Sequence, residues 1–156
     1  MSHQLAACLL LPLLLACPVT AGDKPPSAER LRQLISQLGD EDADVRESAK
    51  GALWVIDTPA VSGLVQAMRQ SRSWRVRSNA AELVAKIAPK DPAVLRALIR
   101  ILQEDKDELV RQVAAGALGE MRPRPKAAVP ALVQALREDR NGDVRLQVAF
   151  SVAEIA

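Results

Sequence analysis

The chain has 156 residues, of which 26% are charged, and its formal net charge of +2 excludes the strongly basic field of a general polyanion binder. Its single histidine is His3, its only cysteines are Cys8 and Cys17, and it has no tyrosine. Everything beyond residue 17 therefore lacks the commonest general base, the commonest zinc ligands and thiol nucleophiles, and we expect no catalytic centre, no cofactor and no metal site.

The first 21 residues have the layout of a secretory signal peptide. An apolar run from Leu5 to Ala16 ends at small residues and is too short for a stable membrane span, which needs about 20 apolar residues. Cleavage after Ala21 gives soluble export. A leader that ends at Ala16 resembles a bacterial lipoprotein signal, in which Cys17 carries the lipid. A cytosolic protein with an apolar tail is the third alternative. We expect export, to the periplasm or to a lipid anchor at Cys17, with residues 22–27 as a linker.

Residues 28–156 repeat one helix-pair pattern four times. The dipeptide Val-Arg recurs at spacings of 31, 34 and 34 residues, and the positions 3, 7 and 10 residues after each arginine are apolar in every copy. These offsets share one face of an α-helix, and a second apolar stripe precedes each arginine. The pattern predicts first helices near 28–38, 60–70, 92–103 and 127–137, and second helices near 43–56, 74–88, 107–121 and 142–156.

Polar turns with aspartate and serine join the two helices of each pair, and prolines separate the pairs. There is no alternating run typical of a strand, so we expect essentially no sheet. The repeat predicts one domain with units of about 28–57, 58–89, 90–122 and 123–156.

The segments DADVRESAKGAL, DELVRQVAAGALGEM and AAVPALVQALRED resemble HEAT repeats, specifically the short bacterial kind also seen in phycobilisome lyase-like arrays. The resemblance covers roughly residues 28–156. It implies an all-α fold, a right-handed α-solenoid of about four HEAT-like helix pairs. In that geometry the first helices lie on the convex side and the second helices line the concave side.

The resemblance also implies that the repeat arginine bonds an acidic residue of a neighbouring unit. This structural ladder would consist of Arg46, Arg77, Arg111 and Arg145. The expected acceptors are Asp42, Asp44, Asp107 and Asp143. The second unit departs from the pattern, because it has Arg72-Ser73-Trp74 where an acidic residue is expected.

A binding face is expected where the second helices turn away from the core, at offsets 1, 5 and 8 after each arginine. Trp54 and Phe150 occupy such offsets, and large exposed aromatics often anchor partners. The alternative is that Trp54 covers the first unit and a following element covers Phe150. Gly116 and Gly119 form a flat step that could admit a helix. The predicted face comprises Glu47, Trp54, Ser78, Glu82, Gln112, Gly116 and Phe150.

The sequence ends at Ala156, one residue past the apolar Ile155 and without the polar outer face of a capping repeat. Either the sequence is a fragment of a longer array, or this bare end meets a partner or a second copy. We expect a non-catalytic exported scaffold that binds another protein through a solenoid surface. Basic clusters around Trp74 and Arg122 leave an anionic envelope polymer open as a ligand, whereas export and mixed charge argue against nucleic acid. The alternatives are an enzyme helper of the bilin-lyase type and a self-associating structural protein.

Overall fold

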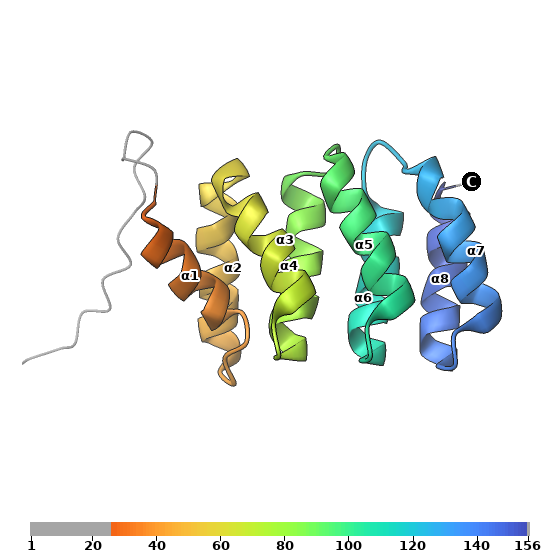
Figure 1. Cartoon of the computed structure of the whole chain (residues 1–156), viewed down its shortest axis with the longest axis horizontal. Coiled ribbons are helices and arrows are strands. Elements are labelled where there is room, and N and C mark those ends of the chain that lie inside the picture. The colour runs from red at the N-terminus through yellow and green to blue at the C-terminus, as the bar shows by residue number, and fades with distance from the viewer. Residues whose placement is uncertain (1–25, 156) are drawn as a thin grey trace, which may run out of the picture.

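Four helical hairpins stand side by side in one row (Figure 1). The computed structural model describes residues 26–155, which contain no strand. The helices are α1 (Ala28–Gln37), α2 (Ala43–Ile56), α3 (Val61–Gln70), α4 (Trp74–Ile87), α5 (Pro92–Glu104), α6 (Glu108–Glu120), α7 (Val129–Glu138) and α8 (Gly142–Ile155). Two 3₁₀ turns that the sequence pattern did not reveal, Thr58–Ala60 and Lys126–Ala128, lead into α3 and α7. The expected all-α solenoid is confirmed.

Most helices begin at a polar side chain that caps them. Asp42 and Asp107 each accept a hydrogen bond from the backbone N–H two residues further on, at 2.9 and 3.0 Å. Asp91 does the same for α5, and Ser27, the last residue of the expected linker, caps α1. Such bonds satisfy amide groups that have no carbonyl partner inside the helix. Ser73 makes no such bond, so α4 begins without a side-chain cap.

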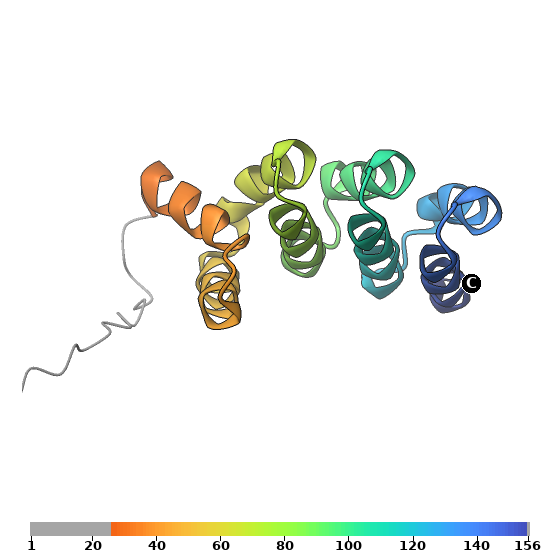
Figure 2. The ribbon, with the colours of Figure 1, turned by 90° about the horizontal axis from the view of Figure 1, so that it is seen from below.

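The first helices form one layer and the second helices form the other (Figure 2). The row bends slightly, so that the second helices line its inner side (Figure 2). One continuous core lies between the layers. It includes equivalent leucines of the first helices, none more than 3% exposed: Leu34, Leu64, Leu98 and Leu132. From the second helices it includes the residues three positions after each arginine: Ala49, Ala80, Ala114 and Val148. Each fully buried leucine contributes about 1.5–3 kcal/mol to folding.

Small residues let neighbouring second helices approach closely. A Cβ atom at Gly119 would lie 2.9 Å from the Cα atom of Ser151, which is shorter than any ordinary contact. The Ser151 hydroxyl donates a hydrogen bond of 2.8 Å to the carbonyl of Ala115 across the same interface. The prediction of an open step at Gly119 was therefore wrong, because the helix that this glycine admits is α8 of the same chain.

Within residues 26–155 no helix is both long and apolar enough to cross a membrane. The same part of the chain holds no group of three histidine, cysteine, aspartate or glutamate side chains placed to bind a metal ion. The expected signal peptide, with Cys17, lies outside the described residues.

Candidate interaction surface

Two buried arginines, Arg77 and Arg111, join adjacent units through equally buried aspartate side chains. The Nε atom of Arg77 donates to Asp105 Oδ2 at 2.7 Å and its Nη2 atom to Oδ1 at 2.9 Å. Arg111 holds Asp139 with the same two bonds at the same distances. All four side chains are no more than 7% exposed. These bidentate pairs fix the second unit to the third and the third to the fourth.

The same arginines also close the turn of their own unit. In each of the four units, Nη1 donates to the backbone carbonyl six residues earlier, at 2.7 to 3.0 Å. The donors are Arg46, Arg77, Arg111 and Arg145. Each guanidinium is thus oriented by its own turn, and in Arg77 and Arg111 the Nε and Nη2 atoms face the next unit.

The expected acceptors of the ladder were wrong. Asp42 and Asp107 cap helices, and neither makes a side-chain bond to a repeat arginine. Asp44 and Asp143 are exposed in the first turns of α2 and α8. The acceptors are instead the aspartates that follow α5 and α7. Aspartate recurs six residues before the repeat arginine in three of the four units, and this spacing is the signal that could have identified them.

The joint between the first two units has no such ion pair. The equivalent acceptor position is Ser71, and Arg46 bonds only backbone carbonyls of its own turn. Asn79 on α4 instead donates a 2.8 Å bond to the carbonyl of Leu38. Lys50 on α2 lies 3.3 Å from a carboxylate oxygen on α4. The ladder therefore links only the second, third and fourth units.

Electrostatics keep the ladder charged. The hydrogen bond from Arg111 lowers the pKa of Asp139 below its ordinary value, although burial acts in the opposite direction. Hydrogen bonds to their carboxylates raise the pKa values of Arg77 and Arg111. These groups stabilise the packing, and their burial gives them no access to a ligand.

A groove of about 400 Å³ runs across α4, α6 and α8. These helices belong to the layer on the inner side of the row (Figure 2). The groove is lined by Glu82 and Lys86 of α4, by Gln112, Val113, Gly116, Ala117 and Glu120 of α6, and by Gln147 of α8. A hollow of about 280 Å³ shares Lys86, Ala117 and Glu120 with it and extends to Trp54. We call these two hollows together the second-helix groove.

Trp54 borders one end of the second-helix groove with 53% of its surface exposed. The equivalent offset holds Ala85 in α4 and Gly119 in α6, both of which are buried. The bulky indole therefore stands at a position where α4 and α6 carry a small, buried residue.

Glu82 in the groove is paired with two lysines. The Lys86 ammonium donates to Glu82 Oε1 at 2.7 Å, and Lys50 reaches the other oxygen of the same carboxylate. Burial alone would raise the pKa of Glu82, but these two lysines outweigh it and the pKa is lowered. A surface on which positive and negative side chains alternate suits a polar peptide or helix better than a polyanion.

The second-helix groove brings together part of the expected face. Trp54, Glu82, Gln112 and Gly116 all line it. Glu47 is exposed beside Lys50, Ser78 is half-buried, and Phe150 is exposed on α8; none of these three lines the groove. The offset rule missed Lys86, Glu120 and Gln147, which line the groove from offsets 2 and 9.

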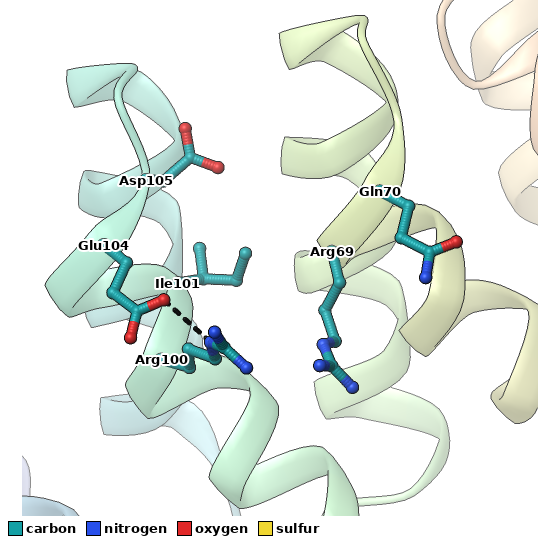
Figure 3. Close-up of a pocket in the computed structure, with 6 residues that line it drawn as sticks. All are labelled: Arg69, Gln70, Arg100, Ile101, Glu104 and Asp105. Carbon is teal, nitrogen blue, oxygen red and sulfur yellow. Dashed lines mark hydrogen bonds and ion pairs between the residues drawn. The ribbon is translucent and has the colours of Figure 1, made fainter.

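A smaller hollow of about 220 Å³ lies between α3 and α5 on the opposite face. Figure 3 shows the guanidinium groups of Arg69 and Arg100 turned into the space between these helices. Arg100 is held by a 2.7 Å bond to Glu104, and Asp105 at the edge of the hollow is engaged by Arg77. This hollow is polar, some of its charged groups already pair with one another, and it has no exposed apolar side chain that could anchor a partner.

The sequence profile described as HEAT repeats matches residues 28–119 and, in a second register, residues 61–153. The two matches together include all eight helices, apart from the last residues of α8. No curated protein matches the chain significantly.

Proposed function

Because the chain belongs to the HEAT-repeat family, we propose that it is a non-catalytic scaffold that binds another protein along the second-helix groove. The observation that carries the proposal is the exposed indole of Trp54 at the end of that groove. An indole exposed to water lacks the favourable free energy of burying its apolar surface. A partner that covered the ring would supply this free energy. Tryptophans in such settings are frequent anchors of protein interfaces.

The shape and chemistry of the groove favour a protein over a small molecule. Its hollows are open rather than enclosed, and together they are lined by residues of all four described second helices. Its lining combines the Trp54 ring and small apolar surfaces with the amides of Gln112 and Gln147 and the charges of Lys86 and Glu120. Such a surface supplies an apolar anchor beside polar groups that fix orientation, which is typical of a protein interface.

We also propose that the protein acts in the cell envelope. The support is the apolar run that precedes the repeat domain and ends at small residues. Mass spectrometry of the mature N-terminus tests this directly. A first residue Gly22 indicates soluble export and a lipid-modified Cys17 indicates membrane anchoring, whereas an intact Met1 contradicts export.

The binding proposal is tested by affinity capture from envelope extracts with the wild type, Trp54→Ala and Trp74→Ala. Trp74 is the matched control, since it is also partly exposed but lies outside the groove, with Arg75 stacked 5.0 Å from its ring centre. Loss of an anchor residue weakens binding by about 2 kcal/mol or more, or roughly thirtyfold. We expect a protein that is retained by the wild type and Trp74→Ala and lost by Trp54→Ala. Equal recovery by all three baits, or equal loss in both variants, contradicts the proposal.

A further inference from the structure

The outer face of α8 is apolar and uncovered in the structure. Leu146 is 57% exposed and Phe150 is 61% exposed, and Ala149 and Ala153 on the same side are exposed as well. They stand at offsets 1, 4, 5 and 8 after the repeat arginine. On α6 the same offsets hold Gln112, Ala115, Gly116 and Gly119, and α8 packs closely on that side through Ser151 and Gln147. The face of α8 therefore corresponds to the half of an inter-unit joint that receives the next second helix.

Arg145 completes this half-joint. Its Nη1 atom bonds the carbonyl of Asp139 at 2.7 Å, as the equivalent atoms of Arg77 and Arg111 bond their own turns. In those two arginines the Nε and Nη2 atoms hold a carboxylate of the next unit. Among residues 26–155 no carboxylate reaches Arg145. Its guanidinium is thus oriented to receive an aspartate that this part of the chain does not supply.

The opposite end of the row carries the complementary half. Asp40 occupies the position of Asp105 and Asp139, and its Oδ1 accepts a 3.0 Å bond from the N–H two residues on, as theirs do at 2.9 Å. It is exposed, and no arginine side chain within the described residues reaches its carboxylate.

The second helix beside Asp40 presents a suitable packing surface. Ser48 and Ala52 on α2 stand at the offsets of Gln147 and Ser151, the residues with which α8 contacts α6. Ser48 is exposed and Val55, about two turns further along α2, is 56% exposed. Small and apolar residues at these positions leave room for the larger side chains on the outer face of α8.

We propose that the α8 face of one copy docks on the α1–α2 face of a second copy. Arg145 binds Asp40 of the second copy, while Leu146 and Phe150 pack near its Ser48 and Ala52. The contact repeats the geometry of the two internal joints. It is head-to-tail, so it leaves one free half-joint at each end and builds an open series. A closed two-fold dimer through α8 would place two guanidinium groups in one interface and leave both copies of Asp40 without a cation.

The test is sedimentation analysis of the processed full-length chain over a range of concentrations. The wild type should form species larger than a dimer that grow with concentration. Arg145→Glu alone and Asp40→Arg alone should each weaken association by roughly thirtyfold or more, because each leaves like charges opposed in the contact. An equimolar mixture of the two variants should associate again, since each then offers the charge that the other needs.

The controls separate docking from misfolding. Arg69→Glu changes the charge by the same amount on the first-helix face and should leave association unchanged. Recovery in the mixture excludes unfolding as the cause of the two single losses. A wild type that stays monomeric, association that stops at a dimer, or a mixture that does not recover overturns the proposal. These outcomes do not depend on whether a partner protein binds the second-helix groove, so this proposal and the proposed function can fail separately.

Discussion

The cost of removing one buried carboxylate measures how strongly the repeat arginines hold the units together. In Asp105→Ala the guanidinium of Arg77 keeps its backbone bonds but loses two carboxylate bonds of 2.7 and 2.9 Å, at a site where both side chains are no more than 6% exposed. A buried cation left without its counter-ion costs about 3–5 kcal/mol. Asp105 also accepts the N–H of Asp107 in its own turn. We therefore expect the free energy of unfolding to fall by about 4 kcal/mol, a large fraction of the 5–15 kcal/mol that is ordinary for a domain.

Urea unfolding followed by circular dichroism provides the assay, with Asp143→Ala as the control. Asp143 is an exposed aspartate in the first turn of α8, and its removal should change stability by only about 0.5 kcal/mol. The double variant Arg77→Met/Asp105→Leu should regain much of the loss, because no buried charge then lacks a partner. Since repeat arrays can unfold in parts, a broadened or split transition in Asp105→Ala counts as the same weakening of the joint. If Asp105→Ala costs no more than Asp143→Ala, the ladder does not hold the units.

Three further results are expected. Ser71→Asp supplies the carboxylate that Arg46 lacks and should stabilise the chain by about 1 kcal/mol in urea unfolding; no gain would show that the first joint cannot adopt the geometry of the others. The pKa of Asp139 is lowered by folding, so its contribution is full above the unfolded value of about 3.9 and is lost as the pH falls through the lowered folded value. Asp139→Asn should therefore flatten the acid side of a pH–stability curve, and an unchanged slope below about pH 4 contradicts this. Gly119→Ala should destabilise the chain by about 1–3 kcal/mol, because its Cβ atom would lie 2.9 Å from the α8 backbone. Gly51→Ala should stabilise it by about 0.5–1 kcal/mol, because its Cβ atom would meet nothing within 4 Å. A change in melting temperature of the same sign for both variants would be inconsistent with this packing.

The helices and their core faces could be predicted because a periodic apolar stripe is a direct consequence of helix geometry. Which aspartate receives each arginine could not be predicted in the same way. Asp105 and Asp107 stand two residues apart in one turn, and both have side chains able to cap a helix. Only the path of the turn shows that Asp105 faces the preceding unit while Asp107 faces its own helix.

The candidate site was predicted in part for a related reason. Offsets 1, 5 and 8 point away from the core of an isolated hairpin, and Trp54, Gln112 and Gly116 at these offsets line the groove. In a stacked row, however, the neighbouring second helix packs on the same side and buries Gly119. Phe150 escapes burial because no described helix lies beyond α8. The sequence pattern of one hairpin taken alone does not show which of its outward positions a neighbouring second helix will bury.

Site-specific photo-cross-linking in the native host tests the scaffold proposal most directly. A photoreactive residue at Gln112 lies within the second-helix groove, and one at Gln66 lies exposed on α3 in the other layer. The account predicts a protein adduct from Gln112 that disappears when Trp54→Ala is added, and no adduct from Gln66. Adducts from Gln66 alone, or none from Gln112, would contradict the claim that this protein works by binding a partner along its second helices.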